Sequence, residues 1–163
     1  MSALAFLISL FTLLPIQQSP AEKYLDAGYE KYSDEDYKGA ILDYNKAASF
    51  DQLNPEVYYL RGVCYSTMGE TVKAMKDLQM ATELNPEYAE AYYEIGYIFL
   101  TDQNAAEAIK AFDKAIQFDP EFAEALVSRG TAKCMMEDKE GANADWLKAK
   151  ELGIAYSDYM VCD

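Results

Sequence analysis

The chain has 163 residues, of which 51% are hydrophobic, and 28 acidic residues against 14 basic ones give a formal net charge of −14. This length and apolar content suit one folded domain and exclude an acidic disordered tail, while the excess of negative charge excludes a general binder of nucleic acid and argues against anionic lipid surfaces. The chain contains no histidine, which removes histidine-based nucleophile pairs, histidine general bases and the commonest zinc-ligand sets.

The N-terminus differs from the rest of the chain. Residues 1–21 carry no charged side chain, and Ala3 to Ile16 form a mostly apolar run. That run is shorter than the roughly 20 residues that span a bilayer, but it has the length of a signal-peptide core. We expect a cleaved export signal over residues 1–21, which predicts a periplasmic or secreted protein. An uncleaved membrane anchor and an additional helix packed on the fold are the alternatives.

The remainder of the chain repeats with one constant period of 34 residues, which is the spacing from Gly28 to Gly62. Positions one period apart form a column of equivalent residues. Three columns hold small residues, namely Gly28, Gly62, Gly96 and Gly130; Ala40, Ala74, Ala108 and Ala142; and Ala47, Ala81, Ala115 and Ala149. The bulky columns are Tyr24, Tyr58, Tyr92 and Leu126; Tyr44, Leu78, Phe112 and Trp146; and Phe50, Leu84, Phe118 and Leu152. Six columns in register over four copies indicate a stack of units that bury their faces against their neighbours.

Each copy is predicted to be a pair of antiparallel helices. In the third copy, apolar and small residues follow helical spacing over 91–99 and again over 105–116, with a polar break at 101–104 between them. A helix-interior glycine costs about 1 kcal/mol relative to alanine, so we expect each glycine of a first helix to face an alanine of the second at a close contact.

These columns resemble the tetratricopeptide repeat. The resemblance rests on the spacing from Tyr24 to Gly28 and from Tyr92 to Gly96, on Ala40-Ile41, Ala74-Met75 and Ala108-Ile109, and on Pro86 and Pro120 at the ends of copies. It implies an all-α solenoid of about four 34-residue helix-turn-helix repeats at 21–54, 55–88, 89–122 and 123–154, with a C-terminal capping segment at 155–163. It also implies a non-catalytic scaffold or adaptor that binds a protein or peptide and needs no cofactor or metal.

In this family the first helix of each pair lines a concave groove, and the matching columns imply the groove residues. They are Leu25, Tyr29, Tyr59, Leu60, Val63, Tyr93, Glu94, Tyr97, Val127, Ser128 and Thr131. Tyrosines provide rigid amphipathic contact area, although each is as suited to packing between repeats as to contacting a ligand. An acidic row at Glu22, Glu56, Glu90 and Glu124 favours a partner that is apolar and carries Lys or Arg. The same glutamates would also stabilise the positive ends of their helices.

Family members that hold the C-terminal carboxylate of heat-shock chaperones use Lys, Arg and Asn in these columns. Here the columns hold Leu25, Tyr29, Leu60, Glu90 and Glu94, so we do not expect a carboxylate clamp. The alternative function is a structural or self-associating component of an envelope assembly complex, with the groove unused.

Three cysteines are widely separated, which excludes a C-x-x-C redox motif and a zinc knuckle. We expect Cys64 and Cys134 to be small buried side chains and Cys162 to be a free thiol near the terminus. Arg61 and Arg129 match each other by the period, and we expect both to form structural ion pairs.

Overall fold

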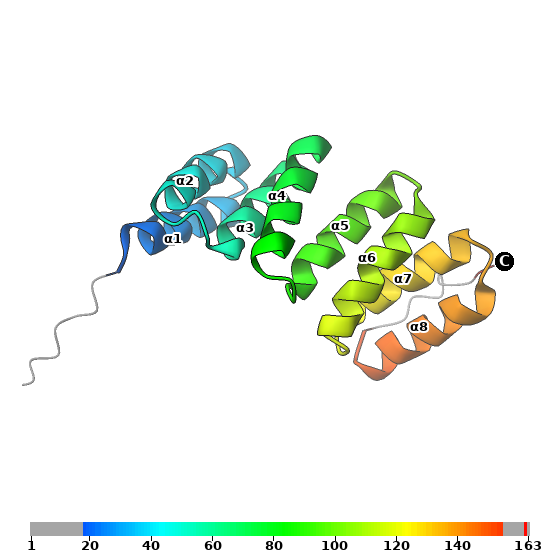
Figure 1. Ribbon diagram of the computed structural model, residues 1–163. Coiled ribbons are helices and arrows are strands. Elements are labelled where there is room, and N and C mark those ends of the chain that lie inside the picture. Colours follow the sequence, from blue (N-terminus) through cyan, green and yellow to red (C-terminus); the bar gives the residue numbers. More distant parts are fainter. Residues whose placement is uncertain (1–17, 155–161, 163) are drawn as a thin grey trace, which may run out of the picture.

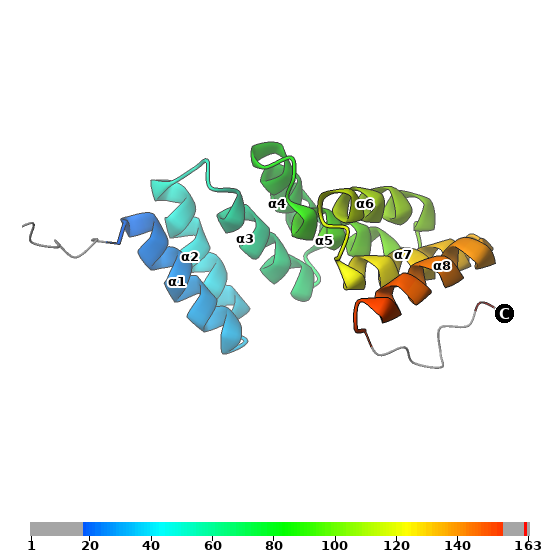
Figure 2. The same ribbon diagram turned by 90° about the horizontal axis from the view of Figure 1, so that it is seen from below.

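The computed structural model describes residues 18–154 and Cys162, and within these residues the chain forms eight α-helices and no strand. The helices are α1 (Pro20–Ser33), α2 (Tyr37–Phe50), α3 (Pro55–Thr67), α4 (Thr71–Leu84), α5 (Ala89–Thr101), α6 (Ala105–Phe118), α7 (Ala123–Met135) and α8 (Lys139–Glu151). They pack as consecutive pairs that lie side by side in chain order (Figure 1). Figure 2 shows the same order from below. The described part of the chain is an α-solenoid of four helix pairs, as the period of the sequence predicts.

Two predicted segments fall mainly outside the described residues. These are the export segment, expected over residues 1–21, and the capping segment, expected over residues 155–163. Pro20 and Ala21 belong to α1, and Ala21 is buried. These two residues of the predicted export segment are therefore part of the first helix.

Polar side chains fix where several helices begin. At the start of α1 the Glu22 N–H donates to Ser19 Oγ at 3.1 Å, and the Ser19 N–H donates to the Glu22 carboxylate at 2.7 Å. This reciprocal pair is a capping box, which satisfies two backbone donors that have no partner within the helix. The side chains of Asp36, Asn104 and Asp138 each accept a backbone N–H from three residues ahead, at the starts of α2, α6 and α8.

The turn inside each helix pair has the same backbone geometry in all four copies. Glu35, Gly69, Gln103 and Glu137 are spaced by one period, and their φ angles are 62°, 74°, 59° and 64°. Only the second copy has a glycine there, the residue that adopts this left-handed conformation without steric cost. The packing of the two helices therefore holds the turn in this conformation where the residue is not glycine.

The columns of small residues bring the two helices of a pair together, but the nearest neighbours of the glycines are large side chains of the second helix rather than the expected alanines, with an alanine backbone also close at Gly62 (Ala74 O at 3.4 Å). A methyl group built on Gly96 would lie 2.6 Å from Phe112 Cε1, and one on Gly62 would lie 3.0 Å from Leu78 Cγ. Gly28 faces Tyr44, and Gly130 faces Trp146, in the same way. Each glycine leaves room for the large side chain of the second helix, which crosses the space that a Cβ would fill. Ala40, Ala74, Ala108 and Ala142 are fully buried beside these contacts.

Ion pairs to buried aspartates join the helices of three copies, which confirms the structural role expected of the two arginines. Arg61 donates to Asp77 through Nε at 2.6 Å and Nη2 at 2.8 Å, and its Nη1 reaches Asn45 of the preceding pair at 2.8 Å. Arg129 repeats this arrangement with Asp145 and with Asp113 of the preceding pair. In the first copy Lys31 pairs with buried Asp43.

The third copy replaces the ion pair with apolar residues. Ile95 occupies the position of Arg61, and Ala111 occupies that of Asp77, each one period further along the chain. Both Ile95 and Ala111 are buried in one apolar cluster. The two positions have therefore changed together, which avoids leaving a buried carboxylate without its partner.

Two of the three cysteines form a disulfide, which differs from the prediction made from the sequence. Cys64 is fully buried, as predicted. Cys134 and Cys162 form a disulfide, with a Cα–Cα distance of 5.6 Å and a sequence separation of 28 residues. Cys134 is therefore not an inert buried thiol, and Cys162 is not free. The bond fastens Cys162 to the C-terminal end of α7.

The glycine contacts predict that Gly96→Leu destabilises the protein by about 1–3 kcal/mol or more, because the new side chain overlaps Phe112. Thermal or urea unfolding followed by circular dichroism measures the change. Ala106→Leu adds a large side chain at an exposed position of α6 and is the control. Equal melting temperatures for Gly96→Leu and the wild type would contradict the close contact.

The ion pairs predict strong coupling between Arg61 and Asp77. Arg61→Ile alone should cost about 3–5 kcal/mol, because it leaves Asp77 buried without a partner. Arg61→Ile combined with Asp77→Ala reproduces the residues of the third copy and should recover most of that loss. A double-mutant cycle measured by urea unfolding gives the coupling, and additive effects would count against the pairing.

Candidate functional site: the inner face of the helix stack

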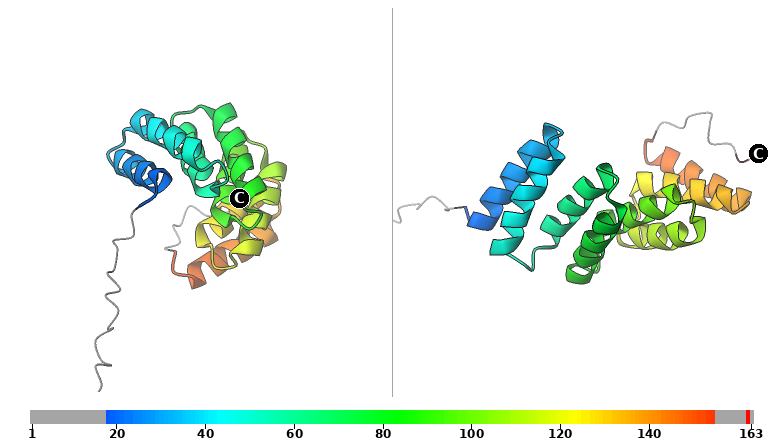
Figure 3. Two further views of the ribbon diagram at one scale, coloured as in Figure 1. Left: turned by 60° about the vertical axis from the view of Figure 1, so that its left-hand side comes forward. Right: turned by 90° about the horizontal axis from the view of Figure 1, so that it is seen from above.

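The first helices of the pairs lie on the inner side of the solenoid. α3 contacts α5, and α5 contacts α7. The second helices of adjacent pairs (α2 and α4, α4 and α6, α6 and α8) do not contact each other as closely. A stack whose first helices approach each other more closely curves with those helices inside, and Figure 3 shows the pairs following an open arc. We call the surface that α1, α3, α5 and α7 present on this side the inner face.

Most of the predicted groove residues reach the surface, but two do not. Tyr29 and Tyr97 are 39% and 46% exposed, and Thr131 is also exposed. The half-buried ones are Tyr59, Val63, Tyr93, Glu94, Val127 and Ser128. Leu25 and Leu60 are only 8% and 7% exposed and belong to the core that joins the first two pairs. The expectation that Leu25 and Leu60 contact a partner is therefore wrong, because both side chains turn into the core.

Tyrosine rings link adjacent first helices across the inner face. The Tyr29 hydroxyl on α1 donates to Glu56 Oε1 on α3 at 2.8 Å. The ring of Tyr59 on α3 lies 5.0 Å from that of Tyr88, which immediately precedes α5. On α5, Tyr93 lies 6.3 Å from Tyr97 between ring centroids. The rings form an aromatic surface over α1, α3 and α5.

Tyr88 and its counterpart Phe122 are not among the residues that the columns of the sequence predicted for the groove. Phe122 precedes α7 and lies 5.0 Å from the ring of Tyr93, as Tyr88 does from Tyr59. The two residues are one period apart and end their copies. That aromatic column could have been found by its period, although it lies in the turns between copies rather than on a helix.

The acidic row has more than one role. Glu22 belongs to the capping box, and the hydrogen bonds it accepts from Ser19 hold its pKa below the ordinary value. Glu56 accepts the Tyr29 hydroxyl. Burial, then the Glu56 hydrogen bond and charge, raise the pKa of Tyr29 to about 12. Glu90 and Glu124 are exposed in the first turns of α5 and α7.

Glu94 is the exceptional carboxylate of the inner face. It is half-buried on α5, and within the described residues no hydrogen bond or ion pair engages its carboxylate. Burial raises its pKa, and no neighbouring cation opposes that shift. By contrast, burial of Asp145 is outweighed by hydrogen bonds from Arg129 and Lys133, which lower the pKa of Asp145.

Among the residues that the structure describes, no basic side chain is available to neutralise the centre of the inner face, which α3 and α5 form. α5 contains no Lys or Arg, and the one basic residue of α3 is Arg61. Its guanidinium is held by Asp77 and Asn45 on the second helices. The centre of the inner face is therefore negative and aromatic.

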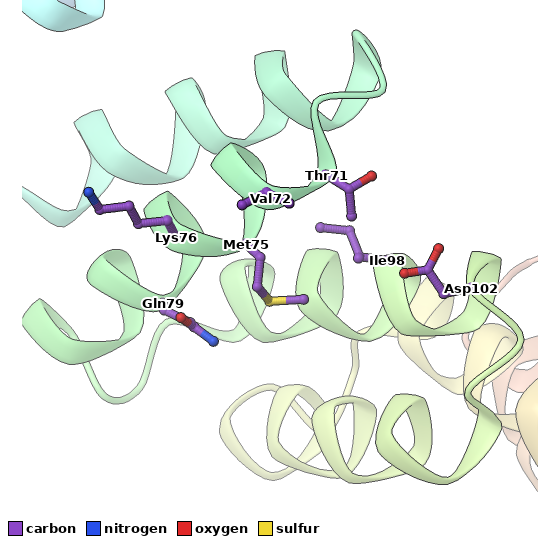
Figure 4. Close-up of a pocket in the computed structure, with 7 residues that line it drawn as sticks. All are labelled: Thr71, Val72, Met75, Lys76, Gln79, Ile98 and Asp102. Atoms are coloured by element: carbon purple, nitrogen blue, oxygen red, sulfur yellow. The ribbon is translucent and has the colours of Figure 1, made fainter.

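A separate depression of about 450 Å³ opens beside α4 (Figure 4). Thr71, Val72, Met75, Lys76 and Gln79 of α4 line it together with Ile98 and Asp102 from the end of α5. The residues one period before Thr71 and Asp102 are Tyr37 and Met68, which pack onto the core at the first junction. Smaller or polar residues at the second junction therefore leave this space.

The described residues offer no metal centre and no membrane span. In residues 18–154, acidic and cysteine side chains do not gather into a group of three that could hold a metal ion. Among the helices that the structure describes, none is both long and apolar enough to cross a membrane.

Comparison with known proteins identifies the family. Models of the tetratricopeptide repeat match residues 55–88 and 89–122, and a model described as TPR repeat matches residues 28–69. The chain belongs to the tetratricopeptide repeat family.

The similar proteins share different parts of the chain. The heat shock protein sti1 homolog of Schizosaccharomyces pombe is 35% identical over 69 residues, which are 42% of this chain but 12% of that protein. The crystal structure of MamA matches with a TM-score of 0.75 at 30% identity, covering 81% of this chain and 77% of MamA. YrrB, described as a TPR protein with an unusual peptide-binding site, matches with a TM-score of 0.69 at 27% identity, covering 87% of this chain and 72% of YrrB.

The raised pKa of Glu94 predicts that Glu94→Gln stabilises the protein at pH 7. Above the ordinary glutamate pKa of 4.5 the unfolded chain is ionised freely, whereas the folded protein must ionise a partly buried group. The gain in melting temperature should shrink as the pH falls through the raised pKa of Glu94 toward 4.5, and it should be lost below 4.5, where both states are protonated. Glu83→Gln, at an exposed position of α4, is the control with the same charge change. A loss of stability in Glu94→Gln at pH 7 would contradict the assignment.

Proposed function

We propose that this protein is a non-catalytic interaction scaffold that binds a peptide segment of a partner protein along its inner face. The observation that carries the proposal is the row of surface tyrosines on three adjacent helices, comprising Tyr29, Tyr59, Tyr93 and Tyr97. Such rings supply large contact area at low conformational-entropy cost and are frequent at binding hot spots. YrrB, a structural neighbour, is described as having a peptide-binding site, which supports the same use of the fold.

The charge of the inner face favours a partner segment that is apolar and basic. Glu56, Glu90 and Glu94 contribute negative charge around the tyrosines, and Arg61 is occupied by Asp77. Opposite charge on the partner would speed encounter and fix its register. A segment ending in several carboxylates would meet like charge instead, so a clamp for an acidic C-terminus is not the function we propose.

We also propose that the protein is exported. The apolar run over residues 3–16 has the length of a signal-peptide core. The Cys134–Cys162 disulfide supports this location, because disulfides persist mainly in oxidising compartments such as the periplasm and the extracellular space.

Affinity purification from the native source tests the interaction proposal. The wild type should retain a specific partner, and Tyr93→Ala combined with Tyr97→Ala should lose it while circular dichroism still reports a folded helical protein. Tyr92→Ala is the matched control, since Tyr92 stacks on Phe118 and Lys114 lies over its ring. Retention of the partner by the folded double variant would contradict the proposal. Growth of particle size with concentration in light scattering would favour self-association instead.

The mass of the mature protein tests export. Ser19 and Pro20 begin α1, so processing that preserves the first helix must leave a new terminus at or before Ser19. We expect intact-mass spectrometry of protein from the native source to show loss of the apolar segment. A full-length mass in that material would contradict cleavage, and membrane extraction would then distinguish an anchor from a packed helix.

A further inference from the structure

Glu94 is the half-buried carboxylate that the fold itself does not use. The buried aspartates of the described residues all have cationic partners: Asp43 pairs with Lys31, Asp77 with Arg61, and Asp145 with Arg129. These pairs compensate the desolvation of their carboxylates. Among the described residues, none compensates the desolvation of Glu94 in this way. Burial raises the pKa of Glu94, and no cation lowers it.

The repeat does not require an acid at this position. The residues at the same place in the other copies are Asp26, Leu60 and Ser128. Leu60 fills the core there, and Asp26 is exposed. An acidic side chain that is partly desolvated in only one copy is therefore a property of this protein rather than of the repeat.

Aromatic residues lie near this carboxylate on two helices. Tyr93 precedes Glu94 on α5, and Tyr59 of α3 packs against the apolar cluster that contains Ile95, the residue after Glu94. The negative charge of Glu94 adds to the effect of burial in raising the pKa of both phenols. The ring centroids of Tyr88 and Tyr59 are 5.0 Å apart, and those of Phe122 and Tyr93 are also 5.0 Å apart, with the rings tilted against each other in both pairs. The faces of aromatic rings attract cations, and the attraction increases when the cation is partly removed from water.

We propose that Glu94 receives a lysine or arginine side chain of the bound peptide, between the rings of Tyr59 and Tyr93 on the inner face. This inference rests on the proposed function and specifies which contact selects the peptide. The cation would supply the ion pair that Glu94 lacks, while the aliphatic part of the Lys or Arg side chain would pack on the tyrosine rings. Positions on either side of the basic residue would contact the exposed rings of Tyr29 and Tyr97, so apolar residues fit there.

Four pools of labelled nine-residue peptides test this inference. The central residue is Lys, Arg, Gln or Glu, and the flanking positions are a fixed mixture of apolar residues and serine. Binding of each pool to the purified full chain is measured by fluorescence anisotropy in 0.3 M salt, where long-range attraction to the net charge of −14 is strongly screened. The Lys and Arg pools should bind about tenfold more tightly than the Gln pool, as a charge-assisted contact gives.

Two variants assign the preference to Glu94. Glu94→Gln should bind the Lys, Arg and Gln pools equally, although it is expected to be at least as stable as the wild type. Glu83→Gln removes the same charge from an exposed site on α4 and should keep the preference for Lys and Arg. A preference that survives in Glu94→Gln would overturn the inference.

The outcomes also separate this inference from the proposed function. If the wild type binds all four pools equally and Tyr93→Ala with Tyr97→Ala abolishes that binding, the inner face binds peptides but Glu94 does not select them. The inference would then be wrong and the proposed function would stand. If the wild type binds none of the pools, peptide binding by the inner face is contradicted, and the inference is overturned with it.

Discussion

The contact between a glycine of the first helix and a large side chain of the second is the constraint on which each helix pair depends. Phe112 and its counterparts in the other copies cross the first helix where only a hydrogen atom leaves room for them. The contact brings the helices close and buries a large side chain of the second helix. Because it recurs once in every period, the first helices of successive pairs come to the same side of the stack. The inner face is a consequence of that regularity.

Buried carboxylates have cationic partners in the core but not at Glu94 on the inner face of the described residues. In the core, an aspartate is either paired with a basic residue or replaced together with its partner, as Ile95 and Ala111 show in the third copy. On the inner face, Glu94 is partly buried without a cation in the described part of the chain. Natural proteins commonly accept such local losses of stability where a surface has a function. Tyr59 is held by its contact with the Tyr88 ring, and Tyr29 is held by its hydrogen bond to Glu56, so little order would have to be gained by these side chains on binding.

The period predicts the helix pairs, their boundaries and the ion-pairing arginines, because these features depend on spacing along the chain. The period does not predict how deeply each side chain is buried. Leu25 and Tyr59 occupy equivalent positions, yet Leu25 is buried and Tyr59 reaches the inner face, since side-chain size and polarity decide how far each turns inward. The partner of each glycine depends on the rotation of one helix against the other. The disulfide joins Cys134 to a residue beyond the last repeat, where the period gives no information.

The most direct test of the account is to map where a peptide binds. The tightest Lys-centred peptide would be titrated into 15N-labelled protein, and the backbone amide shifts would be assigned to residues. We expect the largest changes around Tyr59 on α3 and Tyr93–Tyr97 on α5. Changes concentrated at Val72, Met75 and Ile98, around the depression beside α4, would show that the protein binds peptides elsewhere and would contradict the role of the inner face.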